Sequence, residues 1–380
     1  MTRYDFIIAG GGVAGLSLAR HLLRSPLRER SILIVDQDAK DRNDRTLCFW
    51  SEQPTLFDDL VHRAWRQLRF AGEDFEQVID LGHYRYNMIR AVDFYQCIRR
   101  ELSTCANAQL LQGNITRIED GADEARVWVD GRTVAGQWVF DSRFDSSSWQ
   151  PDPARYHQLR QHFTGWEIET PDAAFDTRAA TFLDFRTPQN DEMRFLYVLP
   201  LSERRALVEC VLTSRDDYAS ILKTYLETVL EISAYRIVAE EGGVNPMTDQ
   251  PFPRRIGRRV MSIGARGGRV KPSSGYAFTR IQRDSAALVE SLLRAGHPFA
   301  VPSDRRFFRL CDSLMLNVMY RRGAQLRPIF TALFKRNSIE RIFRFLDEVT
   351  SPLENLALMA SLPPGIFVQA FMRLKVLRRI

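Results

Sequence analysis

The sequence predicts an α/β fold in three parts, on three observations. A strand–helix–strand pattern occupies residues 4–36, aromatic strands with polar links recur between 151 and 254, and helical periodicity without strands runs from 301 to 380. The 380 residues exceed one ordinary domain. We expect residues 1–150 and 255–300 to form one discontinuous unit, with 151–254 an antiparallel sheet and 301–380 a helical region.

The N-terminal pattern is a βαβ unit. Residues 4–9 form an apolar strand, residues 10–15 read GGGVAG, and residues 32–36 form a second apolar strand that ends in a carboxylate. The apolar helix positions between the strands follow the helical period. Together these features predict a Rossmann-type, dinucleotide-binding unit.

Each residue of the glycine motif has a physical role. Gly10 permits the tight turn, Gly12 lets backbone approach a pyrophosphate, and Gly15 lets helix and strand pack closely. The helix N-terminus is an anion site. Asp36 lies about 20 residues on, where a carboxylate accepts from a ribose hydroxyl. The alternative is a glycine turn that serves packing alone.

Two further residues of this unit are candidates. Arg45 follows a polar loop after the second strand, and it either reaches a phosphate or is an ordinary surface arginine. Residues 138–141 form a buried strand that ends in Asp141. By fold analogy, this strand rejoins the nucleotide-binding sheet.

The remaining elements follow from periodicity and turn residues. Residues 92–102 predict a helix, residues 110–118 a strand, and residues 125–134 a strand pair that turns at Asp130-Gly131. A helix is expected over 217–232. The predicted antiparallel strands are 163–168, 179–185, 194–201 and 206–213.

A second glycine-rich loop follows the short strand 260–264 and leads into a helix over 275–293. Its backbone amides and the helix N-terminus could meet a cofactor. A purely structural turn explains the loop equally well.

Composition narrows the function classes. The net charge of +6 is modest, and no nucleic-acid-binding module is recognised. The five cysteines form no C-x-x-C pair and the six histidines show no ligand spacing, so we expect reduced thiols and no metal site. No signal-peptide pattern and no apolar run long enough to span a membrane is seen.

The region from residue 303 is helical, with breaks expected at Pro328, Pro352 and 363–364. It is amphipathic and basic, which is typical of a helix on an anionic membrane surface, or of a solvated face over a core. Its basic residues are Arg321, Arg322, Arg327, Lys335, Arg336, Arg341, Arg344, Arg373, Lys375, Arg378 and Arg379.

Glu209 is the candidate proton donor. Strand alternation places it on one face with Leu207 and Val211, and both faces of the strand are otherwise apolar. Burial without a partner would raise the pKa of this carboxyl, as a general acid requires. The alternative is a structural pair with Arg186 or Arg194.

Other side chains near this strand have open roles. Asp184 shares a face with Arg186, which favours a structural salt bridge over a part in the site. The aromatic residues either stabilise a cation or fill the core; these are Phe182, Phe185, Phe195, Tyr197 and Tyr276.

Ordered segments resemble a known family: residues 45–50, 182–186, 195–202, 207–209 and 263–276, with the N-terminal unit, are similar to the bacterial lycopene β-cyclases. These are FAD-dependent carotenoid cyclases of the p-hydroxybenzoate-hydroxylase type. The resemblance implies that FAD extends from the first glycine loop to residues 264–275. It also implies that Glu209 is the catalytic acid–base.

The implied activity is redox-neutral cyclisation of the ψ-ends of lycopene, through γ-carotene to β-carotene, beside reduced FAD with NAD(P)H as reductant. The alternative is a flavin-dependent monooxygenase or reductase acting on an isoprenoid or aromatic substrate. We expect a monomer bound peripherally at the cytoplasmic face of the membrane. The residues assigned to the cofactor are Gly10, Gly12, Val13, Ala14, Gly15, Asp36, Arg45, Asp141, Gly264, Gly268, Gly275 and Tyr276.

Overall fold

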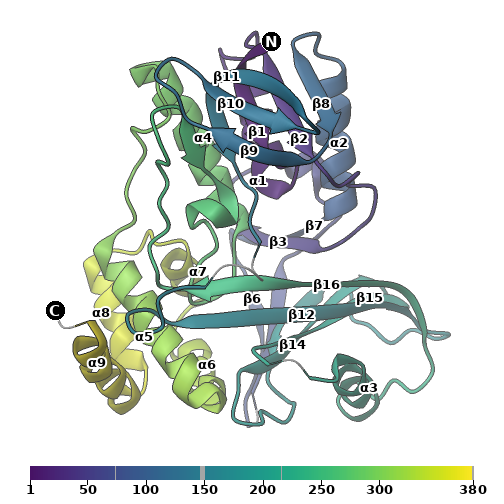
Figure 1. The fold of residues 1–380 in the computed structure, drawn as a ribbon. Helices are drawn as coiled ribbons and strands as arrows, with labels where there is room; N and C mark the ends of the chain where they lie inside the picture. Colours follow the sequence, from purple (N-terminus) through teal and green to yellow (C-terminus); the bar gives the residue numbers. More distant parts are fainter. Residues whose placement is uncertain (73, 146–149, 215, 379–380) are drawn as a thin grey trace.

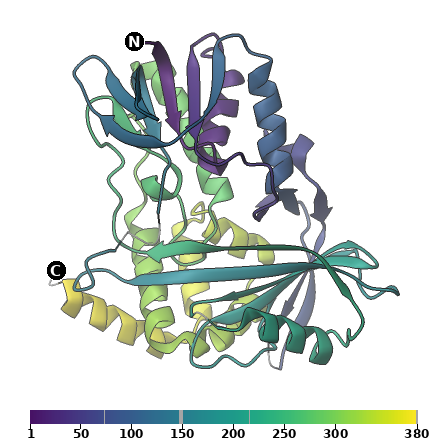
Figure 2. The ribbon, with the colours of Figure 1, turned by 45° about the vertical axis from the view of Figure 1, so that its right-hand side comes forward.

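The computed structural model describes residues 1–72, 74–145, 150–214 and 216–378, with side chains to Leu374. Two seven-stranded sheets form the frame, joined by a small three-stranded sheet. The first sheet lies at the top of Figure 1, and the long strands of the second cross beneath it. The C-terminal helices lie beside the second sheet, as Figure 2 also shows.

The first sheet carries the N-terminal βαβ unit. Its order is β8-β2-β1-β11-β10-β9, and β17 pairs with β11. The predicted return of the 138–141 strand is confirmed, because β11 runs parallel to β1 with Ala9 opposite Asp141. The bounds are β1 (Arg3–Ala9), α1 (Val13–Leu23), β2 (Ile32–Asp36), α2 (Ala91–Ser103), β8 (Ala108–Gln112), β9 (Ile115–Glu119), β10 (Ala125–Val129), β11 (Arg132–Asp141) and β17 (Val260–Ser262).

The single strand predicted over 110–118 is wrong. The chain forms two strands, β8 and β9, at opposite edges of the sheet, and Gly113 lies in the crossing between them. A Cβ on Gly113 would lie 2.7 Å from side-chain atoms of both Asp130 and Val129, so a larger residue in this crossing would require those side chains to shift. The hairpin at Asp130-Gly131 is confirmed, with φ of 47° and 78° at its two turn residues.

The second sheet is antiparallel except between β13 and β5, in the order β16-β12-β15-β14-β13-β5-β6. Two of its strands, β5 and β6, come from the N-terminal part of the chain, a segment for which the sequence pattern predicts no element. Its bounds are β5 (Gln67–Ala71), β6 (Glu76–Asp80), β12 (Gln158–Glu169), β13 (Ala179–Asp184), β14 (Arg194–Ser202), β15 (Arg205–Leu212), α3 (Tyr218–Thr228) and β16 (Arg236–Thr248). The small sheet contains β3 (Thr46–Ser51), β4 (Arg63–Trp65) and β7 (Arg85–Arg90), with η1 (Asp58–Leu60) between β3 and β4.

The C-terminal helices pack on the second sheet through aromatic contacts, for example Phe334 stacked on Phe70 with ring centroids 4.3 Å apart. The break expected at Pro328 is wrong. This proline is the third residue of α6, where its missing N–H costs no helical hydrogen bond, and the break falls at η3 instead. The bounds are η2 (Gly264–Gly267), α4 (Phe278–Ala295), α5 (Arg306–Arg322), η3 (Gly323–Gln325), α6 (Leu326–Arg336), α7 (Ile339–Leu346), α8 (Pro352–Ser361) and α9 (Pro364–Arg378).

Within the described residues, no single helix has the length and apolar character needed to cross a membrane. Helices α8 and α9 meet that test only as a pair, bent by 111°. Helix α4 begins three residues later than expected, because Gly275 adopts a φ of 78° in the turn that precedes it.

Candidate functional site

A cavity of about 1140 Å³ is lined by residues of both large sheets. It meets the carboxyl ends of β1 and β2 on one side and the face of β14 and β15 on the other. Nine of the thirteen residues that the sequence assigns to catalysis or to the cofactor line it: Gly10, Gly12, Val13, Ala14, Asp36, Arg45, Glu209, Gly275 and Tyr276.

The glycine turn has the geometry expected of an anion site. Gly10 has a φ of 106°, and a Cβ on Gly15 would lie 1.9 Å from the Gly10 carbonyl oxygen. A Cβ on Gly12 would meet no described atom within 4 Å. The first amides of α1, which receive no side-chain cap from Gly12, therefore border open cavity.

Asp36 closes this end of the cavity. Its Oδ2 accepts a hydrogen bond from the Gly11 amide at 2.6 Å, and its Oδ1 accepts one from the Asp38 amide at 2.8 Å. These bonds fix the carboxylate at the end of β2, where it can accept from a sugar hydroxyl. Arg45, whose Nη2 lies 3.0 Å from Asp44, lines the same region and supplies positive charge.

The second glycine loop borders the cavity. Ala265, Arg266, Val270 and residues 274–277 line it, with Gly275 at a φ of 78°. Ser262 and Ser274 line the cavity, and their buried hydroxyl oxygens find no hydrogen-bond partner among the described residues. A buried hydroxyl without a partner is costly, so these two residues are polar positions of the cavity lining that the described residues leave unsatisfied.

Four predicted cofactor residues lie outside the cavity lining of the described structure. They lie in the layer next to the lining and hold the turn, the loop or the side chains that form it. Gly15 packs α1 on the turn, and Gly264 touches the same helix, since a Cβ on Gly264 would lie 2.5 Å from Ala14. Asp141 holds Arg143 at 2.9 Å and Arg266 at 3.2 Å, and both arginines line the cavity. Gly268 provides the left-handed end of η2, at a φ of 72°.

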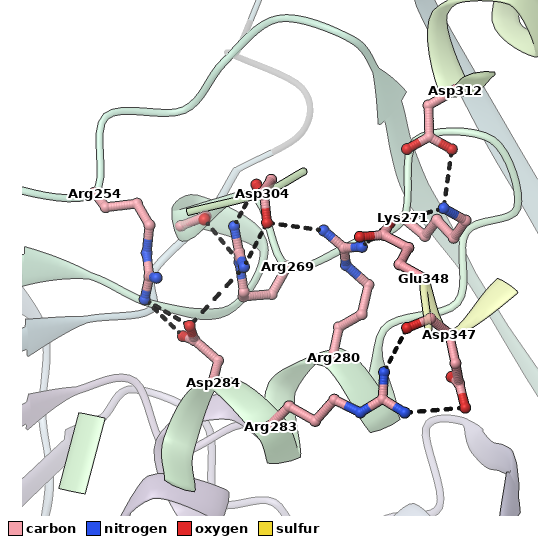
Figure 3. Close-up of polar contacts among 11 residues, drawn as sticks. Arg254, Arg269, Lys271, Arg280, Arg283, Asp284, Asp304, Asp312, Asp347 and Glu348 are labelled. Carbon is pink, nitrogen blue, oxygen red and sulfur yellow. Dashed lines mark hydrogen bonds and ion pairs between the residues drawn. The ribbon is translucent and has the colours of Figure 1, made fainter. Parts of the chain in front are cut away.

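Buried ion pairs fix the second loop to the C-terminal helices (Figure 3). The Lys271 ammonium lies 3.1 Å from Asp312 on α5 and 2.9 Å from Glu348 after α7. Burial lowers the pKa of Lys271, but the two carboxylates more than offset this, so that the pKa is raised. Arg269 continues the network by pairing with Asp304 at 2.9 Å. The loop is thereby held at three points.

The opposite wall of the cavity is apolar around one carboxyl. Leu207, Glu209 and Val211 all line the cavity, which confirms the predicted alternation. The arginine alternative for Glu209 is wrong: Arg186 pairs with Asp184 at 2.7 Å, and Arg194 pairs with Glu192 and Asp216. The structural bridge predicted for Asp184 is confirmed.

Glu209 has instead a carboxyl partner, Glu241 on β16, to which it is hydrogen-bonded. Burial raises the pKa of Glu209 well above its ordinary value, and the charge of Glu241 and their hydrogen bond raise it further. Burial also raises the pKa of Glu241 to about 7, against the opposing effect of hydrogen bonds from Thr46. The pair therefore favours holding a proton near neutral pH.

Sequence reasoning missed Glu241. The signal that could have found it is Gly165, a glycine inside the predicted strand 163–168, which indicates close approach by a neighbouring group. Only the register of β16 shows which residue approaches.

Aromatic side chains enclose the acid. The Tyr197 and Tyr276 hydroxyls lie 3.0 Å apart and line the cavity with Tyr86 and Cys48. Phe182, Phe185 and Phe195 lie in the hydrophobic core instead. Of the five aromatic candidates, only the two tyrosines are thus placed to face a substrate.

One group of metal-ligand types occurs among the described residues: Asp59, Cys97 and Glu101. Arg20 Nη2 lies 2.6 Å from Asp59 and 3.0 Å from Glu101, so an arginine already neutralises these acids.

The cavity residues fit an extended dinucleotide. Open helix amides and Arg45 suit phosphates, Asp36 suits a ribose, and the unpartnered Ser262 and Ser274 hydroxyls lie at the far loop. Because two separate loops reach one cavity, the site suits a molecule longer than a mononucleotide.

Comparisons with known proteins agree with this geometry. A plant neoxanthin synthase (Solanum tuberosum) is 25% identical over 335 residues, covering 82% of this chain and 65% of its own length. The lycopene beta cyclase of Arabidopsis thaliana is 24% identical over 313 residues, covering 76% and 60%. The chain thus spans slightly less than two thirds of these two relatives.

Solved structures resemble the fold at low identity. A geranylgeranyl bacteriochlorophyll reductase-like protein of Thermoplasma acidophilum superposes with a TM-score of 0.62 at 11% identity, covering 98% of this chain and 100% of its own. The Klebsiella pneumoniae HpxO R204Q variant complexed with FAD gives 0.61 at 14%, covering 93% and 100%. The predicted α/β class is confirmed as an FAD-dependent hydroxylase-like fold. The family model described as lycopene cyclase protein matches residues 5–372, so the chain belongs to the lycopene cyclase protein family.

Proposed function

We propose that this protein cyclises the linear ψ-ends of lycopene to β-ionone rings, through γ-carotene to β-carotene, with FAD bound in the cavity. The observation that carries the proposal is Glu209, a carboxyl with a raised pKa in an apolar cavity wall. Membership of the lycopene cyclase protein family over residues 5–372 supports it.

The reaction needs an acid in a dry site. The Glu209 carboxyl donates a proton to the terminal double bond, the ring closes through a tertiary carbocation, and a different proton leaves to complete the new double bond. Product and substrate are isomers, so no electrons are consumed. Leu207 and Val211 exclude water, and the faces of Tyr197 and Tyr276 stabilise the cation.

Gly12, Val13 and Ala14 would hold the phosphates of FAD, Asp36 its ribose, and Ser274 with Tyr276 the far end of the cofactor. When bound and reduced, with electrons from NAD(P)H, FAD supplies negative charge beside the developing cation. Asp141 orients Arg143 and Arg266 toward the same cavity.

Expression in a lycopene-accumulating host, followed by pigment analysis, tests the activity. We expect β-carotene from the wild type and at least ~10²-fold less product from Glu209→Gln, because the amide has no acidic proton to give. Glu203→Gln is the matched control, since Glu203 is exposed in the turn before β15. Full cyclisation by Glu209→Gln would remove this carboxyl from the mechanism.

The rival proposal is a flavin monooxygenase or reductase acting on an isoprenoid or aromatic substrate. It is favoured by the fold, which the reductase-like protein of Thermoplasma acidophilum shares. Purified protein with NADPH and lycopene in liposomes separates the two. The cyclase consumes no NADPH beyond that needed to reduce the flavin, whereas one NADPH per product molecule would establish the rival.

We also propose that the helical region, residues 301–380, docks this protein as a monomer on the cytoplasmic face of a membrane. A forty-carbon hydrocarbon dissolves in the bilayer, so its enzyme must reach that phase. Large apolar side chains of α8 and α9 are exposed: Leu353 by 79%, Leu356 by 68%, Val368 by 60% and Met372 by 60%. Exposed Arg321, Arg322, Lys335 and Arg336 belong to the same region, while Arg379 lies outside the described residues.

Flotation with phosphatidylcholine vesicles, with and without phosphatidylglycerol, tests the docking. We expect binding that needs the anionic lipid, and a loss of at least about a hundredfold in Leu353→Ser/Leu356→Ser, since each of the two buried leucine side chains contributes ~1.5–3 kcal/mol. Leu293→Ser on α4 is the control, because Leu293 is also exposed, by 45%, but lies outside the helical region. Equal flotation of all variants would contradict this surface.

A further inference from the structure

The two carboxyls of the cavity wall meet across a strand that lies between them. In the second sheet β12 separates β15 from β16, and Gly165 of β12 is opposite Glu209 on one side and Glu241 on the other. The three residues therefore lie in one row across the sheet, with their side-chain positions on the same face.

Gly165 keeps the space between the acids open. A Cβ built there would lie 3.3 Å from Glu241 Cγ and 3.4 Å from Glu209 Cβ, and 2.9 Å from Leu207 Cδ1. Any side chain at this position would occupy the gap through which the carboxyls make contact. The glycine thus explains how two acids on next-nearest strands share a hydrogen bond.

The two members of the pair have different surroundings. Glu241 accepts hydrogen bonds from the Thr46 amide at 3.0 Å, the Thr46 hydroxyl at 2.8 Å and the Asn43 amide nitrogen at 3.3 Å. Arg45 adds favourable positive charge. All of these interactions stabilise the ionised form of Glu241.

Glu209 has no such support among the described residues. The titratable groups that act on it or feel its charge are Glu241, Cys48 of β3, Tyr197 of β14, Cys210 of β15 and Tyr276 of the second loop, and none of them is a cation. Tyr86 of β7 is in turn hydrogen-bonded to Cys48 and to Tyr276. The single proton of the pair is therefore most stable on Glu209, with Glu241 as its acceptor.

We propose that Glu241 is the positioning residue for the cyclisation acid: through the gap at Gly165 it holds Glu209 in the protonated state and aims its proton. The proposal rests on the proposed function. When Glu209 gives its proton to the alkene, both carboxyls are left anionic beside the carbocation. The proton released at the end of the reaction returns to the pair, so protons balance and no electrons move.

The test compares holoenzyme pH profiles of wild type and Glu241→Gln. Without the Glu241 charge the pKa of Glu209 falls, so the basic limb of the profile shifts to lower pH by at least about one unit. At pH values above the shifted limb, the activity of Glu241→Gln should be about tenfold below that of wild type. Glu240→Gln is the matched control, because Glu240 is the exposed neighbour on β16. A basic limb that does not move in Glu241→Gln overturns the proposal.

Gly165→Ala is a second variant that leaves both acids in place. Its methyl group separates the carboxyls, and the closest contact, the end of the Leu207 side chain, can move. We expect the same shift of the basic limb as in Glu241→Gln. A wild-type profile in a folded Gly165→Ala protein would also overturn the proposal.

Infrared titration of the FAD-loaded protein gives a readout independent of turnover. The carbonyl band of a protonated carboxyl that is lost in Glu209→Gln should titrate at lower pH in Glu241→Gln. If this shift occurs but lycopene is not cyclised, proton sharing stands and the proposed substrate fails. If lycopene is cyclised and the band does not move, the substrate stands and the pairing fails.

Discussion

Glu209 and Glu241 combine two unfavourable features, burial and like charge, and both are relieved by one shared proton. Neither feature suits a structural role, because apolar residues would be more stable at both positions. Retention of two acids beside an apolar cavity is therefore typical of a site that uses their proton.

The same pair predicts a pH dependence of stability. A carboxyl with a higher pKa in the folded protein binds its proton more tightly when folded. Its contribution is complete below the ordinary value of 4.5 and is lost as pH rises through the folded value, about 7 for Glu241. Each pKa unit corresponds to about 1.4 kcal/mol.

We therefore expect the free energy of unfolding of the cofactor-free protein to fall between pH 5 and pH 8 more steeply in wild type than in Glu241→Gln, and Glu241→Gln to be the more stable at pH 8. Urea denaturation at both pH values measures this difference. Parallel pH dependences would show that the two carboxyls are not coupled in the fold.

At the scale of elements, the turn between β1 and α1 contains one glycine that is needed for packing and another that is needed for binding. Gly15 has no room for a side chain, since a Cβ would lie 1.9 Å from a carbonyl oxygen, whereas Gly12 borders open cavity. Two glycines three residues apart thus have different physical requirements.

We expect Gly15→Ala to destabilise the fold by about 3 kcal/mol or more, since overpacking here meets backbone. Gly12→Val should fold normally and fail to retain FAD, because its side chain fills the space needed for phosphate. Thermal unfolding and flavin absorbance of the purified variants check both. A yellow Gly12→Val protein would contradict a cofactor at this turn.

Element predictions were most accurate where local pattern and tertiary environment agree. The βαβ unit and the Asp130-Gly131 hairpin follow from apolar period and turn chemistry. The prediction of one strand over 110–118 was wrong because residues 108–112 pair with β2 and residues 115–119 pair with β10, which are far apart in the sheet. A local sequence pattern contains no information on which strand a segment will pair with.

At the scale of the whole molecule, Lys271 joins three parts: the second cofactor loop, α5 and the segment after α7. Figure 3 shows these charges meeting between the loop and the helices. The position of the loop therefore depends on the C-terminal region.

We expect Lys271→Ala to destabilise the protein by ~3–5 kcal/mol, because Asp312 and Glu348 are left buried near each other with less positive charge. Flavin retention should fall with it. Chemical denaturation of Arg178→Ala gives the control, since Arg178 pairs with Asp176 at the surface and its loss should leave the stability almost unchanged. Equal effects of the two substitutions would mean that the buried network contributes little.

The sequence by itself determined the α/β class, the glycine turn with Asp36, and the solitary acid of an apolar strand, since these depend on periodicity and on residue chemistry at fixed local spacing. Tertiary structure alone decided the partner of that acid. Glu241 lies 32 positions further along the chain (residue 241 against 209) on a strand whose pairing with β12 is non-local. Strand register and packing bring such residues together, and a local sequence pattern predicts neither of them.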